Sequence, residues 1–188
     1  MSGSDTRTAD WWPAIRSTAT TSACGRFRYR LARHWGEMAD QSTLLFVMLN
    51  PSTADAVVND PTIKRCMAFA RAHGFDGIEV VNLFDFRATK PADLARHGYP
   101  VSAQCDHHIE WAVRHASQVC VAWGAHASRP AVAARVQQVM PILFRQNKQP
   151  MCLHITASGH PQHPLMLPRT CELKPFTLEA IAAAMWAG

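Results

Sequence analysis

The sequence predicts a three-layer α/β/α fold with a mainly parallel central sheet. Three observations lead to this fold class: apolar runs of strand length alternate with amphipathic segments of helix length, the joins are short, and each apolar run ends in polar residues. A chain of 188 residues suits one domain, because a globular chain of this size buries roughly 70% of its unfolded surface. We expect a partly flexible N-terminal arm over residues 1–25 and a single α/β domain over residues 26–188.

The first half of the domain predicts an edge strand and then a strand, a helix and a strand. Apolar and basic residues alternate over residues 27–33, with the period of two that is typical of an edge strand. Residues 44–49 form a continuous apolar run, as in a strand that helices cover on both faces. Asp60 then offers an N-cap and Pro61 a first helical position for an amphipathic helix, and residues 78–84 form the next strand. This order is typical of a right-handed parallel crossover.

The second half of the domain continues the alternation, with Ser102 and Thr177 as predicted N-caps. The expected elements are a helix over residues 102–116, a strand over 119–123, a helix over 127–146, a strand over 151–155 and a closing helix over 178–186.

Four polar loops follow predicted strands. In a parallel α/β sheet, ligands bind in the crevice outside the carboxyl ends of the strands, so these loops should converge on one site. They comprise residues 50–55, 82–89, 124–128 and 158–165.

The composition indicates a folded cytoplasmic protein. Hydrophobic residues make up 48% of the chain and charged residues 18%, which excludes a disordered chain. No apolar run reaches the roughly 20 residues of a membrane-spanning helix, so we expect no membrane partner. Met1 to Asp10 lack the apolar core of a secretory signal. The six cysteines form no C-x-x-C pair, which favours reduced thiols over disulfides or structural zinc.

The charge balance favours an anionic partner. A formal net charge of +5 raises the local concentration of phosphates and so favours nucleotides or nucleic acids. The alternating arginines of residues 26–33 are equally typical of a solvated strand face. The sequence does not predict an oligomeric state.

The loop after residues 44–49 is the first candidate ligand site. Asn50 ends the strand and precedes Pro51, which fixes a turn, so the Asn50 amide can face the crevice as a paired donor and acceptor. Ser52, Thr53 and Asp55 add hydroxyl and carboxylate groups to the same loop. An ordinary capping or turn role is the alternative for each of them.

The loop after residues 78–84 is the second candidate. Asn82 is a carboxamide among apolar strand residues, and it can pair with the edge of a base while Phe84 supplies a stacking face. The alternative for Asn82 is a structural hydrogen bond to a loop. Arg87 can hold a phosphate through two parallel hydrogen bonds or form an internal ion pair with Asp85 or Asp55.

Two later loops supply further candidates. His160 and His163 lie between prolines after the last predicted strand, and a positioned imidazole can stabilise an oxyanion or act as general acid or base. A loop-bracing role is the alternative, and zinc binding by this pair lacks a third ligand. Gly124 ends a strand and allows a ligand, or the next helix, to approach the backbone closely.

Common cofactor motifs do not occur in the chain. There is no G-x-G-x-x-G, Walker A, H-E-x-x-H or G-x-S-x-G pattern, and we expect no cofactor. Asp55, Asp60 and Asp85 supply the oxygen ligands that divalent cations prefer, but without the spacing of a dedicated metal loop, so we expect no metal.

Five sequence blocks in order carry a family resemblance: MLNPSTAD, NDPTIKRC, EVVNLFDFRAT, AWGAH and GHPQHPL. Over residues 25–188 they closely resemble the bacterial and phage family called domain of unknown function 1643. More distantly, the loops resemble the uracil-DNA glycosylase superfamily, a three-layer α/β/α fold that acts on flipped bases.

The glycosylase resemblance implies roles for particular residues. It implies that Asn50 positions water, that the backbone of residues 51–53 binds the sugar, and that Asn82 reads the pyrimidine edge. It also implies that His160, with residues 161–162, stabilises the departing base and presses into DNA. The chain departs from the pattern where the usual glycine before the polar pair is replaced by Met48-Leu49, and where His-Pro-Gln-His-Pro replaces the common His-Pro-Ser-Pro.

These features lead to three hypotheses, all with a nucleotide or nucleic acid as partner. The first is hydrolysis of the N-glycosidic bond of a modified base or nucleotide, with Asn50 and His160 as catalytic residues. The second is a non-enzymatic nucleotide- or nucleic-acid-binding module on the same fold. The third is a metal-dependent nucleotide hydrolase that uses the aspartates.

Overall fold

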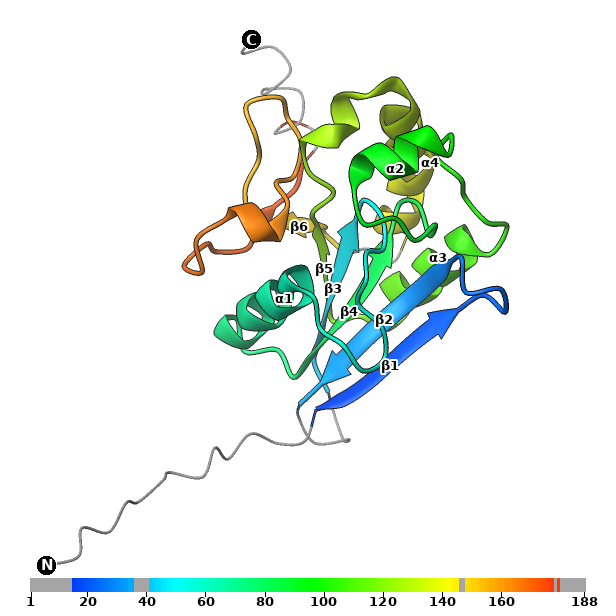
Figure 1. The fold of residues 1–188 in the computed structure, drawn as a ribbon. Coiled ribbons are helices and arrows are strands. Elements are labelled where there is room, and N and C mark those ends of the chain that lie inside the picture. Colours follow the sequence, from blue (N-terminus) through cyan, green and yellow to red (C-terminus); the bar gives the residue numbers. More distant parts are fainter. Residues whose placement is uncertain (1–14, 36–40, 146–147, 178, 180–188) are drawn as a thin grey trace, which may run out of the picture.

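The fold is described by a computed structural model for residues 15–35, 41–145, 148–177 and 179 (Figure 1). Within these residues, seven strands form one sheet in the order β1-β2-β4-β3-β5-β6-β7. The strands are β1 (Arg16–Thr21), β2 (Arg28–His34), β3 (Thr43–Met48), β4 (Gly77–Asn82), β5 (Gln118–Val121), β6 (Met151–Cys152) and β7 (Lys174–Pro175). The helices are α1 (Pro61–Ala72), α2 (Pro91–Arg96), α3 (Cys105–His115) and α4 (Pro130–Phe144), with 3-10 turns η1 (Ala125–Ser128) and η2 (Pro164–Met166).

The sheet is mixed. Parallel pairing is confined to its centre, where β4, β3, β5 and β6 run side by side. The pairs β1–β2, β2–β4 and β6–β7 are antiparallel, so the prediction of a mainly parallel sheet is wrong. The reason is that β1 and β2 form a hairpin whose second strand pairs with β4. Strand β1 lies within the segment that the sequence assigned to the N-terminal arm.

Helices cover both faces of the parallel centre (Figure 1). All six residues of β3 are buried, as expected for its apolar sequence. Alternate residues of β3 and β4 pack against α1 on one face and against α3 and α4 on the other. No helix of the described residues is long and apolar enough to span a membrane.

The predicted helix caps have different outcomes. Asp60 caps α1 as expected, since its Oδ1 accepts a hydrogen bond of 2.9 Å from the Ile63 N–H. Ser102 does not cap α3, which begins at Cys105 after Gln104. The Ser102 Oγ accepts the Gln104 N–H at 3.3 Å, and the Ser102 N–H and hydroxyl donate to the buried Asp85 carboxylate. The N-cap is Gln104, so the predicted N-cap position is wrong.

Several predicted boundaries also shift. The helix predicted over residues 127–146 is divided, because η1 precedes α4 and a proline occupies the first position of α4. The strand predicted over residues 151–155 is the two-residue β6. The closing helix predicted over residues 178–186 lies outside the described residues except for Glu179.

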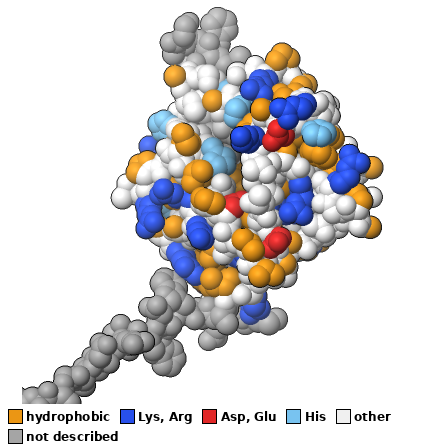
Figure 2. All heavy atoms as spheres, viewed as in Figure 1, with side chains coloured by type: hydrophobic (Ala, Val, Ile, Leu, Met, Phe, Trp, Pro, Cys, Tyr) orange, Lys and Arg blue, Asp and Glu red, His pale blue; other side chains and the backbone are white. Residues whose placement is uncertain are grey.

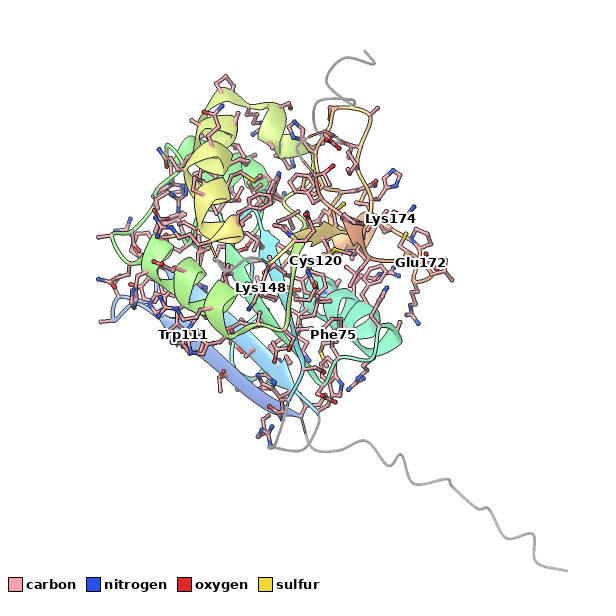
Figure 3. The ribbon with its side chains drawn as sticks, turned by 180° about the vertical axis from the view of Figure 1, so that it is seen from behind. Phe75, Trp111, Cys120, Lys148, Glu172 and Lys174 are labelled. Atoms are coloured by element: carbon pink, nitrogen blue, oxygen red, sulfur yellow. The ribbon has the colours of Figure 1, made fainter. Side chains whose placement is uncertain are left out.

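A β-bulge in β2 determines which way its arginines point. The register between β1 and β2 shifts at Tyr29. The Tyr29 ring stacks on His108 of α3 with centroids 4.5 Å apart. The Arg30 guanidinium lies 3.6 Å from the ring centroid of Trp111 on the same helix, and Figure 3 shows Trp111 there. Two consecutive residues of β2 therefore face α3. The bulge consequently turns Arg28 toward the opposite face, on which α1 lies.

Candidate functional site

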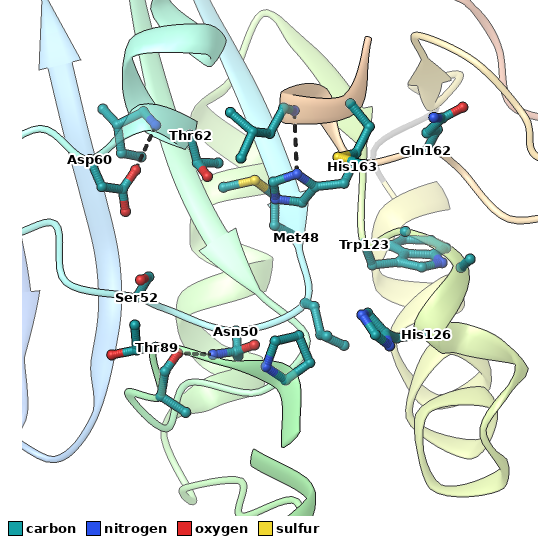
Figure 4. A pocket seen from close by; sticks show the side chains of 18 of the residues that line it. Met48, Asn50, Ser52, Asp60, Thr62, Thr89, Trp123, His126, Gln162 and His163 are labelled. Carbon is teal, nitrogen blue, oxygen red and sulfur yellow. Dashed lines mark hydrogen bonds between the residues drawn. The ribbon is translucent and has the colours of Figure 1, made fainter. Parts of the chain in front are cut away.

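A cavity of about 610 Å³ opens at the carboxyl ends of β3 and β5 (Figure 4). Its volume falls within the roughly 300–1,000 Å³ of small-molecule pockets. All four loops that the sequence predicted to converge contribute to its wall, together with the N-terminal turn of α1, so the predicted convergence is confirmed. The lining residues are Arg28, Met48, Leu49, Asn50, Ser52, Asp60, Thr62, Ile63, Ala88, Thr89, Pro91, Trp123, Gly124, Ala125, His126, Thr156, Gln162, His163, Leu165 and Met166.

The wall combines apolar and polar groups. Figure 4 shows Asn50 and Ser52 on one side of the cavity, Asp60 and Thr62 on another, and Trp123 on a third. On the face of the molecule seen in Figure 2, Lys and Arg side chains surround a central area of mainly hydrophobic, His and uncharged side chains, with a few Asp or Glu side chains, one of them near the centre. An apolar cavity with a few convergent polar groups is typical of a small-molecule site.

Not all predicted site residues line this pocket. Those that do are Asn50, Ser52, Gly124 and His163. Those outside its lining are Pro51, Thr53, Asp55, Asn82, Phe84, Arg87 and His160.

Asn50 is fixed by its amide nitrogen. Its Nδ2 donates to the carbonyl oxygens of Pro51, at 3.1 Å, and Ala88, at 2.6 Å. The Ala88 N–H in turn donates to the Pro51 carbonyl at 2.9 Å, so the two loops are tied together. The Asn50 Oδ1 has no hydrogen-bond partner within the described part of the chain. Because the donors of this amide are occupied, its oxygen is the atom left to accept a hydrogen bond from water or ligand.

His163 is the histidine of the late loop that faces the pocket. Its Nδ1 accepts a hydrogen bond of 3.3 Å from the Leu165 N–H, so the proton of the neutral ring lies on Nε2. Burial lowers the pKa of His163, an effect that Asp60 opposes and His126 reinforces. Near pH 7 the side chain is therefore a neutral Nε2–H donor.

His160 does not line the pocket, although the sequence assigned it the catalytic role. Its backbone N–H donates to the Thr156 hydroxyl at 3.1 Å, and its carbonyl accepts from the Thr156 N–H at 2.9 Å. The turn begins at Thr156, which lines the cavity, whereas His160 at its end is not a lining residue. The sequence offered two His-Pro pairs, and the turn from Thr156 to His160 determines that the second one, at His163, lines the cavity.

Arg28 is a pocket residue that sequence reasoning missed. Its side chain is 2% exposed, and its Nη1 donates to the Ala54 carbonyl at 2.7 Å. Its Nε is buried without a partner among the described residues. Burial lowers the pKa of Arg28 to about 10, and the nearby Asp60 carboxylate opposes part of this lowering. Because a pKa of about 10 is above 7, the guanidinium is charged at pH 7. No pattern in the sequence indicates this placement, because Arg28 is one of several alternating arginines that are typical of a surface strand until the bulge is known.

Trp123 is the second missed residue. It is 2% exposed, follows β5 and packs edge-on against Phe176 with ring centroids 5.7 Å apart. Its Nε1–H is buried with no acceptor among the residues described. A buried indole N–H normally finds a partner, so it is a candidate donor to a ligand. A tryptophan directly before Gly124 at a strand end was the available sequence signal.

The second predicted loop lines the pocket through Ala88 and Thr89, whereas its predicted site residues lie outside the lining. Asn82 is 2% exposed and lies opposite Met48, a pocket residue, in the pairing of β4 with β3. Both amide atoms of Asn82 lack partners in the described residues. Phe84 is buried, with its ring centroid 5.4 Å from that of Tyr99. In the first predicted loop, Thr53 is exposed and lies outside the cavity lining.

The predicted ion pair of Arg87 is not found among the described residues. Asp85 accepts hydrogen bonds from Ser102 instead. The Asp55 carboxylate accepts the N–H groups of residues 57 and 58, both at 2.8 Å, and these bonds lower the pKa of Asp55. Arg87 is half-buried and lies within electrostatic reach of Arg28.

The predicted aspartates do not gather around one point. Asp60 lines the pocket, whereas Asp55 closes its own turn and Asp85 is buried beneath Ser102. Across the part of the chain that the structure describes, no group of three or more His, Cys, Asp or Glu side chains is arranged to hold a metal ion.

Comparison with known proteins assigns the family. A family model described as "Protein of unknown function (DUF1643)" matches residues 28–165. The chain belongs to this family. The matched segment contains every pocket residue except Met166, so the cavity is built almost wholly from the family's part of the chain. The search of the curated proteins gave no match.

The buried imidazole of His163 gives a test of pH dependence. Its pKa in the folded state lies below the ordinary value of roughly 6.5, so its contribution to stability is present above that pH. It is lost as the pH falls from there through the folded-state pKa, because the unfolded chain takes up the proton first. We therefore expect His163→Gln to reduce the loss of unfolding free energy between pH 7.5 and pH 5, measured by urea unfolding. The matched control, His107→Gln on the exposed face of α3, should follow the wild type.

Proposed function

We propose that the cavity binds a nucleotide or nucleobase and hydrolyses the N-glycosidic bond of a modified base or nucleotide. The observation that carries this proposal is the orientation of Asn50. Its donors are held by two backbone carbonyls, which leaves Oδ1 at the cavity wall as a fixed acceptor for water. A water held in this way has a defined direction of attack, which lowers the entropic part of the barrier.

The other polar groups suit the leaving base. As the water oxygen bonds to C1′, the C1′–N bond breaks, its electron pair leaves with the base, and a water proton passes to solvent. The neutral Nε2–H of His163 stabilises the charge that develops on the base. Trp123 supplies a second donor through Nε1–H, and the apolar side chains of Met48 and Leu49 contact the base.

The catalytic histidine of the proposal is His163 in place of His160. The resemblance of the loops to the uracil-DNA glycosylase superfamily supports the same reaction class, with a glycosylase-like three-layer fold as part of the proposal. A nucleotide or nucleic-acid partner and a cytoplasmic location stay predictions from the sequence.

Base release is the direct test. The protein is incubated with free nucleosides, nucleotides and oligonucleotides that contain damaged bases, and released bases are detected by mass spectrometry. We expect release from at least one substrate, abolished by Asn50→Ala. Saturable binding without product would support a binding module instead, and release of phosphate inhibited by a chelator would support a metal-dependent nucleotide hydrolase.

A further inference from the structure

Arg28 has unused hydrogen-bond donors at the wall of the cavity. Of the five N–H donors of its guanidinium, one side-chain bond is made, to the Ala54 carbonyl. Arg28 forms no ion pair within the described segments, and its Nε is without a partner there. A buried charge normally has a counter-charge or a full set of hydrogen bonds.

Arg33, on the same strand, is an arginine whose guanidinium nitrogens all donate hydrogen bonds. Its Nε donates to the Asn59 side chain at 2.7 Å, and its two terminal nitrogens donate to the carbonyls of Ala32 and Asp55. Arg33 therefore holds the loop that follows Asp55 in place. Arg28, on the same face of β2, lines the cavity with most of its donors unused.

The neighbouring wall also favours an anion. Thr62 and Ile63, in the first turn of the 12-residue helix α1, line the same cavity as Arg28. In α1, Pro61 has no N–H, and Asp60 accepts the N–H groups of Ile63 and Lys64. The Thr62 N–H is therefore the donor of this turn left for a ligand, at the positive end of the helix dipole. Asp60 opposes an anion, but one of its oxygens already accepts the Ile63 N–H. Around Arg28, the cations Arg33 and Arg87 together with Arg28 itself outnumber the anions Asp55 and Asp60.

We propose that Arg28 and the first turn of α1 bind the terminal phosphate of a nucleoside monophosphate, so that the substrate is a free nucleotide. This proposal rests on the proposed function for the nucleoside part of the ligand. Because Arg28 is 2% exposed, a phosphate that reaches it must enter the cavity. A phosphodiester within a nucleic-acid chain links the bound nucleotide to a neighbouring nucleotide, which would have to extend out of the cavity past Arg28. A terminal phosphate meets no such obstacle.

The test compares three ligand types on the full chain, with affinities measured by isothermal titration calorimetry and Tm by thermal unfolding. They are inorganic phosphate, the common ribo- and deoxyribonucleosides, and the 5′-monophosphates of the same nucleosides. We expect inorganic phosphate to raise the Tm of the wild type, and at least one monophosphate to bind about tenfold to a hundredfold more tightly than its nucleoside, the range of a charge-assisted hydrogen bond. Monophosphates that bind no better than nucleosides would overturn the proposal, and this comparison needs no variant.

The variants locate the phosphate. Arg28→Met, which keeps the bulk but not the charge, should abolish the Tm shift with phosphate and equalise the affinities of nucleoside and monophosphate. Arg28→Lys should retain part of both effects, because it keeps the charge. Arg114→Gln, exposed on α3, is the matched control and should behave as the wild type. Unchanged phosphate binding by a folded Arg28→Met, with folding checked by circular dichroism, would overturn the assignment.

The binding and base-release experiments together distinguish the phosphate site at Arg28 from the proposed hydrolysis. If monophosphates bind through Arg28 but no base is released, the phosphate site stands and hydrolysis is wrong. If bases are released from oligonucleotides at the same rate by wild type and Arg28→Met, hydrolysis stands and the free-nucleotide substrate is wrong.

Discussion

Asn50→Ala is expected to lower the kcat of base release by about a hundredfold or more, the cost of losing a positioned reactant. The water that Oδ1 holds is needed in the transition state and contributes little to ground-state binding. The KM should therefore stay within a few-fold of the wild type, a pattern that marks an interaction made in the transition state. Steady-state kinetics on the best substrate of the release screen measures both constants.

Asn50→Asp separates chemistry from loop structure. An ionised carboxylate has no N–H to donate, and it places a negative oxygen against the carbonyls of Pro51 and Ala88. We expect it to reduce the free energy of unfolding by about 1–3 kcal/mol, more than Asn50→Ala, because it leaves buried acceptors facing each other. Full turnover by a folded Asn50→Ala would remove Asn50 from the mechanism.

Much of the fold follows from sequence periodicity, and the exceptions have physical causes. The apolar runs located β3, β4 and β5, because burial on both faces of a strand leaves a continuous apolar sequence. The N-cap and the apolar stripe located α1. Strand β1 was missed because its sequence RSTATT is largely solvent-facing and has no apolar alternation. The prediction that residues 27–33 form an edge strand is also wrong, because β2 lies between β1 and β4. The direction of β2 was unpredictable, since period-two alternation is the same in parallel and antiparallel strands.

The site was predictable where it depends on strand ends, and unpredictable where it depends on a single residue's direction. Asn50 and Gly124 follow apolar runs, so their place at the carboxyl edge could be inferred. Arg28 reaches the cavity because of one unpaired residue in β2, a feature that no periodicity reveals. The choice of His163 over His160 depends on a hydrogen-bonded turn between two similar dipeptides.

Asn82→Leu is expected to raise the free energy of unfolding by about 1–3 kcal/mol, because it removes a buried amide whose donor and acceptor are both unpaired. Most core substitutions have the opposite sign. The side chains of Asn and Leu differ little in size, and Met48 and Val80, which share the sheet face of Asn82, are buried and apolar. Chemical unfolding of the wild type and the variant measures the difference. A loss of stability would mean that the amide has a partner, such as an ordered water.

The same variant tests why an unpaired amide is kept in the core. Asn82 pairs in register with Met48, whose side chain lines the cavity, so a ligand that displaces Met48 would reach the amide. If Asn82 reads a base in this way, Asn82→Leu should both gain stability and lose affinity for the base. This combination is expected of a residue that is kept for function at a cost in stability. Asn82→Asp is the control that keeps the shape: a buried, unpaired carboxylate should lower both stability and binding. A stabilised Asn82→Leu with unchanged affinity would leave the base-reading role of Asn82 without support.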